Sequence, residues 1–379
     1  MIRPPLAVAA VDVIPVRLPL VEPFVIAYGS YPDVLSVLVR VRTADGAAGW
    51  GEATPDPNVT GETWEGAAAM LRETLAPALI GRDAWDRDAA LREIDRRVEF
   101  APAAKAALDI ALHDLVARVL NVPLWALLGG RSKPHLEISR VVSMADPEEM
   151  ATKAASHVAA GFDVIKLKVG EAANAARDAR RVAVVRDAIG PDIGIKVDVN
   201  QGWRTPGTAI GAIRAMEPSR PRYVEQPVAA WDIEGLAEVR RQTGVPIMID
   251  EGCHGPREMQ RAVMLRAADF VNIKLMKTGG IAAALRLNAI AETAGVAAQV
   301  GTMVESSVAS AAGLHLALAL ANVETVEMGG PLMTAADIGD ARAWYDGSRV
   351  RIPDAPGLGI VVDEAAVRRF STDWREVRG

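Results

Sequence analysis

The pattern of apolar and polar positions divides the chain into three segments. Over residues 7–19 and 34–52, apolar residues alternate with polar ones, which is typical of β-strands. Asp45-Gly46 lies between two β-rich runs, as a hairpin turn requires. From about 62 to 130 the apolar residues instead recur every three or four positions, which predicts helices. The first third of the chain is therefore predicted to form a small α+β domain.

In the second segment, residues 135–328, short β-rich runs alternate with helical stretches. Eight such runs follow one another about one βα unit apart: HLEISRVVS, FDVIKLKVG, IGIKVDVN, RYVEQP, VPIMIDE, FVNIKLMK, VAAQVG and VETVEM. A series of this kind predicts a parallel α/β barrel closed on itself. An open doubly wound sheet is the competing architecture, but it requires a Gly-rich phosphate turn after its first strand, and the sequence has none. The third segment, residues 340–379, holds a further β-like stretch that we expect to pack on the N-terminal domain, residues 1–130.

Composition and charge narrow the class of protein. The formal charge of −6 argues against a nucleic-acid-binding surface, which normally carries a basic stripe. Cys253 is the single cysteine, so an intramolecular disulfide is excluded and a cytoplasmic location is expected. No apolar stretch approaches the roughly 20 residues of a membrane-spanning helix. The apolar run near the N-terminus is interrupted by prolines and Asp12, which favours a strand over a signal peptide.

Charged residues lie at the ends of five consecutive strands of the predicted barrel. Because side chains alternate along a strand, Lys166 and Lys168 share one face, and the apolar residues between them belong under the outer helices. The same argument directs four further side chains inward at the later strand ends: Asp198, Glu225, Asp250 and Lys274. Barrel enzymes hold their catalytic groups at this edge of the barrel. Any one acid is more often a helix cap or a surface ion-pair partner, but the joint arrangement favours a functional site.

Three carboxylates without a cysteine or histidine cluster favour a hard cation, and Mg²⁺ is the default. The site therefore predicts Mg²⁺ as cofactor, with no nucleic-acid or membrane partner; a small-molecule carboxylate as substrate is what the family resemblance described next implies. Large barrels often assemble symmetrically, so a homo-oligomer is expected.

The order of these motifs resembles a known family. The segments KLK, DVNQGW, VEQP, IDE and NIKLMKTGGI, together with GWGEA and VTGET, are similar to the enolase superfamily, within its muconate-lactonizing-enzyme subgroup. The resemblance implies a modified TIM barrel of the (β/α)7β type, with an N-terminal α+β capping domain that the C-terminal tail completes. It also implies residue roles: Asp198, Glu225 and Asp250 as metal ligands, Lys168 and Lys274 as acid/base groups on opposite faces of the substrate, Lys166 as a neighbour that tunes Lys168, and Asn200 and Glu251 as supporting groups behind the ligands.

Two lysines on opposite faces permit 1,1-proton transfer, which is racemisation or epimerisation. The NIKLMKTGGI and VTGET segments resemble dipeptide epimerases and acylamino-acid racemases. Dipeptide epimerases of this kind carry an Asp-x-Asp near the last strand, whereas this chain has Glu327 followed by Gly329 at the second position. The departure favours an N-blocked or other substrate over a free dipeptide N-terminus. Two alternatives remain: a lyase or cycloisomerase acting on a hydroxy acid or a muconate-like diacid, and a non-catalytic, metal-dependent carboxylate-binding protein.

A lysine ordinarily has a pKa near 10.4, so a lysine base requires a lowered pKa. We expect a neighbouring ammonium, a nearby metal and partial burial to lower it. Substrate contacts are expected from two N-terminal loops, Phe24–Tyr31 and Pro55–Thr60, and from residues around the last barrel strands. The candidate substrate-binding residues are Phe24, Tyr28, Thr302, Glu305 and Glu327, with Met303 more suited to packing. His254, which lies just past a barrel strand, is interpreted as a loop residue.

Overall fold

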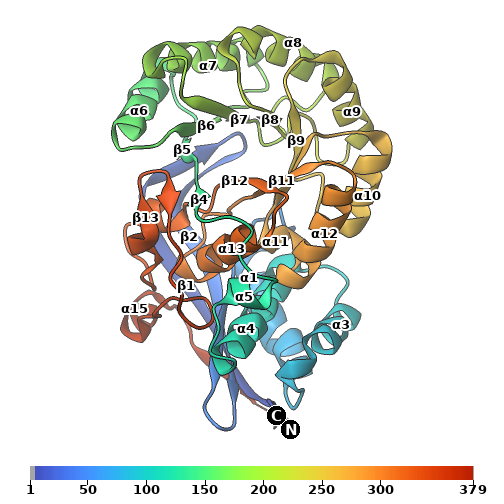
Figure 1. Ribbon diagram of the computed structural model, residues 1–379, viewed down its shortest axis with the longest axis vertical. Helices are drawn as coiled ribbons and strands as arrows, with labels where there is room; N and C mark the ends of the chain where they lie inside the picture. The colour runs from blue at the N-terminus through green and yellow to red at the C-terminus, as the bar shows by residue number, and fades with distance from the viewer. Residues whose placement is uncertain (1–4, 379) are drawn as a thin grey trace.

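The computed structural model describes residues 5–378, so the first four residues of the predicted N-terminal domain and the last residue of the tail lie outside it. An antiparallel sheet forms the N-terminal part, in the order β15-β1-β2-β3. Its strands are β1 (Val8–Ile26), β2 (Gly29–Thr43), β3 (Ala48–Ala53) and β15 (Arg375–Arg378). Strand β15 pairs with β1, so the C-terminal tail does complete this sheet. Figure 1 shows most of the sheet below the barrel.

Helices cover one face of this sheet. They are α1 (Trp64–Met70), a π-helical turn η1 (Leu71–Leu75), α2 (Ala76–Leu79), a 3₁₀ turn η2 (Ala84–Asp86), α3 (Arg87–Arg97), α4 (Pro102–Val119) and α5 (Leu124–Leu127). The Ala-rich α4 packs directly on β3. The approach is so close that a Cβ atom at Gly51 would lie only 1.9 Å from the Ala107 carbonyl oxygen. The glycines of GWGEA therefore permit a close helix–strand contact. Within residues 5–378, no helix combines the length and the apolar character needed to cross a lipid bilayer.

Eight parallel strands form the barrel, in the order β12-β11-β10-β9-β8-β7-β6-β5. They are β5 (Arg140–Val142), β6 (Val164–Lys168), β7 (Gly194–Asp198), β8 (Val224–Glu225), β9 (Ile247–Ile249), β10 (Phe270–Ile273), β11 (Ala297–Val300) and β12 (Val323–Val326). A parallel bridge between Ile138 and Val326 brings the last strand beside the segment that enters the first. The predicted closed barrel is therefore confirmed.

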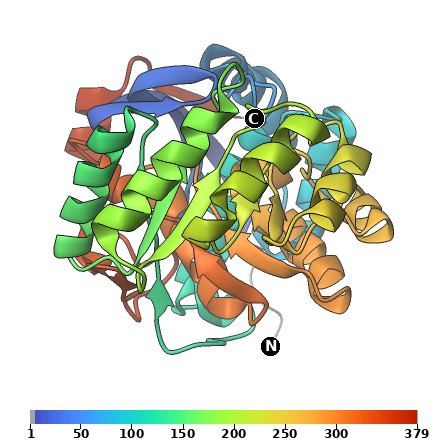
Figure 2. The same cartoon turned by 90° about the horizontal axis from the view of Figure 1, so that it is seen from above.

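Seven helices connect successive barrel strands, which is the predicted (β/α)7β pattern. They are α6 (Pro147–Ala159), α7 (Ala175–Ile189), α8 (Pro206–Met216), α9 (Ile233–Gln242), α10 (Pro256–Leu265), α12 (Ile281–Thr293) and α13 (Ser307–Ala319). A one-turn helix, α11 (Leu275–Thr278), follows β10 and precedes α12. Figures 1 and 2 show the green to yellow helices in a row on the outside of the barrel.

The remaining elements are β4 (Leu136–Glu137), η3 (Glu217–Ser219), α14 (Gly330–Met333), η4 (Ala341–Trp344), β13 (Tyr345–Asp346), β14 (Arg349–Val350) and α15 (Glu364–Phe370). Of these, β4 precedes the barrel, η3 lies within it after α8, and the others follow its last strand. Strands β13, β14 and β4 form a separate small sheet. Residues 24–31, which were expected to form a loop, instead extend the β1–β2 ribbon, since Phe24 pairs with Tyr31 and Val25 with Ser30. The ribbon, rather than a free loop, reaches toward the barrel.

Buried carboxylates of the N-terminal part cap helices of the barrel. Glu52 accepts hydrogen bonds from the backbone N–H groups of Ser306 and Ala309, each at 3.0 Å, at the start of α13. Asp109 accepts from the N–H of Ile281 at the start of α12. A helix N-terminus offers unpaired N–H groups and a favourable dipole for a carboxylate. These contacts fix the N-terminal domain over the barrel and supply the buried carboxylates with N–H donors.

A buried histidine makes the fold sensitive to acid. The ring of His315 in α13 has no exposed surface; its Nδ1 accepts from the Trp125 N–H and its Nε2 lies 3.1 Å from the Leu358 carbonyl oxygen. In this arrangement Nε2 carries the proton and the ring is neutral. Burial lowers the pKa of His315 to about 4. Protonation would set a second ring N–H against the Trp125 N–H.

We expect this histidine to destabilise the folded state below neutral pH. Because its folded pKa is lowered from 6.5, the unfolded chain takes up the proton first, so stability is complete above about pH 6.5 and falls toward pH 4. The loss is about 3 kcal/mol for a shift of this size. Urea unfolding of wild type and His315→Gln at pH 7 and pH 4.5 tests this: the variant should lose less stability on acidification. An equal loss in both proteins would contradict the assignment.

Candidate active site

The candidate site lies at the carboxyl ends of five neighbouring strands. Lys166 and Lys168 come from β6, and Asp198 ends β7. The remaining members sit at the next three strand ends: Glu225, Asp250 and Lys274. All six side chains are buried, with at most 7% of any residue's surface exposed. The parallel register pairs Lys168 with Asp198, which carry unlike charges, and Asp198 with Glu225, which carry like charges.

Close ion pairs join the lysines to the acids. Lys166 Nζ lies 2.9 Å from Asp198 Oδ2, 2.8 Å from Glu225 Oε2 and 2.5 Å from Glu327 Oε2. Lys168 Nζ donates to Asp198 Oδ2 at 2.6 Å. Lys274 Nζ lies 2.8 Å from Asp250 Oδ2. The structure thus brings together every residue for which the sequence suggested a metal-binding or acid/base role.

The supporting residues join the same network. Lys168 Nζ donates to Asn200 Oδ1 at 2.9 Å, and Asn200 Nδ2 donates to Glu251 Oε1 at 3.0 Å. Burial, and then the charge of Asp250, raises the pKa of Glu251 to about 7. Asn200 therefore connects a lysine on one side of the site to an acid beside Asp250 on the other.

The three acids oppose one another electrostatically. Burial, and then the charge of Asp198, raises the pKa of Glu225 well above its usual range. Burial also opposes ionisation of Asp198, but the Lys166 and Lys168 ammonium groups outweigh it and lower the pKa of Asp198 to about 2. For Asp250, the nearby ammonium groups likewise outweigh burial and hold the pKa well below its usual value. Crowded buried carboxylates of this kind require compensating positive charge.

Two lysines of the site, Lys166 and Lys274, have raised pKa values where lowered ones were expected of a lysine base. Burial acts to lower the pKa of Lys166, but Asp198, Glu225 and Glu327 outweigh it and raise that pKa well above normal. For Lys274, too, burial lowers the pKa, while the Asp250 carboxylate outweighs it and raises the pKa. From the sequence we expected a neighbouring ammonium group and a metal to have the largest effects on the pKa of a lysine. In the structure each lysine instead contacts a carboxylate directly.

The donor set fits a hard divalent cation. Within residues 5–378, no group of three or more His, Cys, Asp or Glu side chains is arranged as a ready-made metal site, since lysines lie against the acids. Several buried oxygen atoms nevertheless lack a geometrically satisfactory hydrogen bond: Glu251 Oε2 and Asn272 Oδ1, and also Asp250 Oδ1 and Oδ2, which have only their ion-pair contacts with Lys277 and Lys274. Buried acceptors without donors are costly. Oxygen atoms of this type are the ligands that Mg²⁺ prefers.

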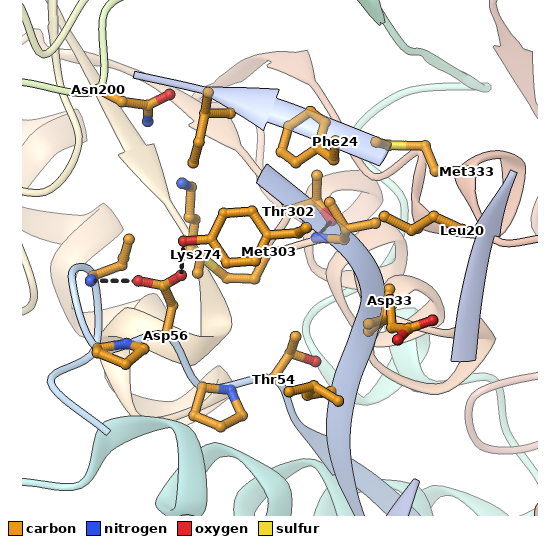
Figure 3. A pocket seen from close by; sticks show the side chains of 18 of the residues that line it. Leu20, Phe24, Asp33, Thr54, Asp56, Asn200, Lys274, Thr302, Met303 and Met333 are labelled. Carbon is orange, nitrogen blue, oxygen red and sulfur yellow. Dashed lines mark hydrogen bonds between the residues drawn. The ribbon is translucent and has the colours of Figure 1, made fainter. Parts of the chain in front are cut away.

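A cavity of about 330 Å³ opens above these residues. Figure 3 shows Asn200 and Lys274 on one side of it and Leu20, Phe24 and Met333 on the other. Lys166 and Lys168 also line the cavity, and the Phe24 ring lies 5.5 Å from Lys168 Nζ. Both N-terminal segments that were expected to meet the substrate contribute to its wall, including Tyr28 and residues 54–57. Tyr31 donates a hydrogen bond to Asp56 Oδ2 at 3.1 Å and so links the two segments.

The residues nominated near the last strands have different positions. Thr302 and Met303 line the cavity, whereas Glu305 does not and is only 1% exposed. The Glu305 carboxylate accepts hydrogen bonds from the Thr302 hydroxyl and from the Met303 N–H, so it shapes the wall from behind. Glu327 borders the cavity, but its Oε2 is engaged by Lys166. His254 is not among the lining residues.

Sequence reasoning missed one lysine at the site. Lys277 was quoted within NIKLMKTGGI but given no role, and its Nζ lies 2.5 Å from Asp250 Oδ1. The signal was its position three residues after Lys274, which places both lysines on one helical turn. Lys196, the other fully buried lysine of the barrel interior, contacts Ser139, Gln299 and Glu327 rather than the three acids.

A closed β/α barrel with acids and lysines on consecutive strand ends, beneath an α+β cap, defines the enolase superfamily. Two family models match the chain: the mandelate racemase/muconate lactonizing enzyme N-terminal domain over residues 8–129, and the enolase C-terminal domain-like family over residues 149–366. The chain belongs to the mandelate racemase/muconate lactonizing enzyme family, in the muconate-lactonizing-enzyme subgroup.

Individual relatives cover almost the whole chain. An N-succinyl-L-Arg/Lys racemase of Bacillus cereus is 43% identical over 96% of this chain and 98% of its own length. The crystal structure of that racemase superposes with a TM-score of 0.96, covering 98% of this chain and 100% of its own. A dipeptide epimerase of Cytophaga hutchinsonii, solved in complex with Mg and the dipeptide D-Ala-L-Val, is 30% identical with a TM-score of 0.94, covering 98% of this chain and 100% of its own.

A chloromuconate cycloisomerase of Cupriavidus pinatubonensis is 33% identical over 89% of this chain and 91% of its own length. Racemases, epimerases and cycloisomerases are all isomerases, and the chain is an isomerase of the enolase superfamily.

Proposed function

We propose that the protein racemises or epimerises an amino-acid derivative by Mg²⁺-assisted proton transfer next to a carboxylate. One observation carries the proposal: Lys168 and Lys274 both line one cavity, and the strands that bear Asp198, Glu225 and Asp250 lie between their strands in the sheet order. The two ammonium groups therefore flank the acids from opposite sides. A pair of proton donors and acceptors on two faces of one carbon is the requirement for inversion.

In each direction of the reaction, one lysine acts as the base and the other as the acid. One of them, as the neutral amine, removes the α-proton, and the other, as the ammonium, returns a proton to the opposite face. The proposed ligands Asp198, Glu225 and Asp250 would hold the cation through their buried oxygen atoms. A bound divalent cation would stabilise the negative charge that develops on the substrate carboxylate as the α-proton leaves. Lys166 neutralises two of the acids and Glu327, and Asn200 orients Lys168.

The residues of the cavity wall favour an amino-acid derivative over a diacid as the substrate. Among the described residues that line it, the cations are Lys166, Lys168 and Lys274, all at the reaction centre. The outer wall is largely apolar and includes Asp33 and Asp56. A second carboxylate, as in muconate, would find no cation there, whereas an amide or an ammonium group would be tolerated. Because Glu327 is engaged by Lys166, it does not stand free to receive a substrate ammonium group.

Deuterium exchange tests the function directly. Purified protein with Mg²⁺ in D₂O would be incubated with dipeptides, N-acetyl and N-succinyl amino acids, proline derivatives and muconates. We expect deuterium at Cα of recovered substrate and formation of the opposite configuration for at least one amino-acid derivative. A lactone or dehydrated product without α-exchange of an amino-acid derivative would instead establish the cycloisomerase or lyase alternative.

A further inference from the structure

Lys277 is a buried ammonium group that the proposed reaction does not use. It belongs to the one-turn helix α11, and its side chain has no exposed surface. It does not line the cavity, so it cannot touch the substrate. Burying an unpaired ammonium group is expensive, and such groups persist where acceptors surround them. The oxygen atoms around the Lys277 ammonium group therefore indicate its structural role.

All of these acceptors belong to one short segment, residues 250–253. Lys277 Nζ donates to the main-chain carbonyl oxygen atoms of Asp250 and Cys253, the latter at 3.1 Å, and lies 2.5 Å from Asp250 Oδ1. Two of the three N–H donors of the ammonium group thus make hydrogen bonds to carbonyl oxygen atoms, and the contact with the Asp250 carboxylate is an ion pair. The segment follows β9 and carries both Asp250 and Glu251. Lys277 thus holds the backbone and the side chain of Asp250 at the same time.

Lys277 also connects Asp250 to Lys274. The backbone N–H of Lys277 donates to the Lys274 carbonyl oxygen at 3.0 Å, so the two lysines form one turn. Lys274 Nζ contacts Asp250 Oδ2, while Lys277 Nζ contacts Oδ1. The two oxygen atoms of one carboxylate are therefore divided between a lysine that faces the cavity and a lysine that does not.

We propose that Lys277 is a positioning residue that fixes the Asp250 segment relative to Lys274, and so sets the geometry of proton transfer on the Lys274 face of the substrate. The proposal rests on the proposed function for its catalytic consequence. The side-chain partners of Lys277 belong to residues 250 and 253, and Asp250 is also the ion-pair partner of Lys274. Loss of Lys277 is therefore expected to affect the two faces unequally.

The test compares Lys277→Met with Lys196→Met. Both replace a fully buried lysine with a side chain of similar length, but Lys196 contacts Glu327, Ser139 and Gln299 instead of Asp250. The rate of α-deuterium exchange is measured from each enantiomer separately, and the enantiomer that stops exchanging in Lys274→Met defines the Lys274 face. Groups that orient a site residue from behind typically contribute 10–100-fold. We expect Lys277→Met to slow exchange on the Lys274 face at least about 10-fold more than on the Lys168 face.

A second readout needs no activity. Amide hydrogen exchange, measured by mass spectrometry on protein treated with chelator, should become at least about tenfold faster over residues 250–255 in Lys277→Met, because two carbonyl anchors are lost. The same segment should be unchanged in Lys196→Met. Lys277→Gln, which keeps amide donors without the charge, serves if the Met variant does not fold.

Equal slowing on both faces, in either Lys277 variant, would overturn the proposal, as would unchanged amide exchange over residues 250–255. Lack of α-exchange by the wild-type protein on every substrate would reject the proposed function instead. In that case the amide-exchange comparison would still decide whether Lys277 holds the Asp250 segment.

Discussion

Replacing Lys274 with methionine will abolish inversion of configuration while one enantiomer continues to exchange its α-proton with solvent. The reason is the position of the two lysines on either side of the acids: each face of the substrate has one proton carrier. A positioned acid/base group contributes about 10²–10⁴-fold, and inversion requires both lysines in each turnover, so the rate should fall by at least about 10³-fold. Lys168→Met should give the mirror result, with exchange retained in the other enantiomer. NMR of recovered substrate in D₂O, with chiral chromatography, measures both quantities.

The selective loss distinguishes catalysis from a general disturbance of the site. Lys274 contacts Asp250 and Lys168 contacts Asp198, so either variant also alters the surroundings of an acid. Such a disturbance would slow α-proton exchange equally in both enantiomers. If each lysine variant lost exchange in both enantiomers to the same extent, the assignment of one lysine to each face would be wrong.

Asp250→Asn will remove both turnover and the response to divalent cations. In the wild type, treatment with chelator should abolish activity, and added Mg²⁺ should restore it and raise the thermal midpoint, since a ligand that binds the folded state stabilises it. The two buried oxygen atoms of Asp250 are held by ion-pair contacts with Lys274 and Lys277 and not by backbone N–H groups, so the carboxylate keeps its charge for a cation. The amide would halve the available oxygen atoms and leave Lys274 and Lys277 without their anion. Activity should fall by at least about 10³-fold, comparable with the loss of a preorganised electrostatic group.

Asp109→Asn is the matched control for this substitution. Asp109 is equally buried, but its carboxylate caps α12 through the Ile281 N–H and lies outside the acid cluster. The control should lose stability, by about 1 kcal/mol for a weakened helix cap, and should keep its Mg²⁺ response. A thermal midpoint that rises equally with Mg²⁺ in Asp250→Asn and in wild type would contradict the proposed metal site.

The reaction centre was largely predictable from sequence because one rule, the alternation of side chains along a strand, determines it. In Lys166-Leu167-Lys168 the central leucine must face the helices, so both lysines face the barrel interior. The same parity places Asp198 and Glu225 beside them, and the parallel register confirms the pairing. When several adjacent strand ends carry buried charges, few arrangements give every charged side chain a partner of opposite sign.

The cavity wall was less predictable, since it depends on contacts between distant segments. Prolines 19 and 23 disturb the alternation, and the β1–β2 pairing shifts its register between Pro19 and Phe24, so the ribbon over residues 24–31 reads as a loop. Glu305 faces away from the cavity because its carboxylate is turned back to Thr302 and Met303, a local fold that no periodicity reveals. Lys277 lies on a helix of one turn, which is too short for an apolar period to indicate its direction.

The pairing of β15 with β1 has a consequence for biosynthesis. Val11 lies opposite Val377, so β1 is synthesised before the whole barrel, and its partner strand β15 only after the barrel. Throughout elongation, β1 has an open edge on the side that β15 will occupy, and its backbone groups there can pair with any extended chain nearby. Completion of this sheet thus requires synthesis of the whole barrel, and a chain that stops before β15 would leave β1 with an unpaired backbone edge.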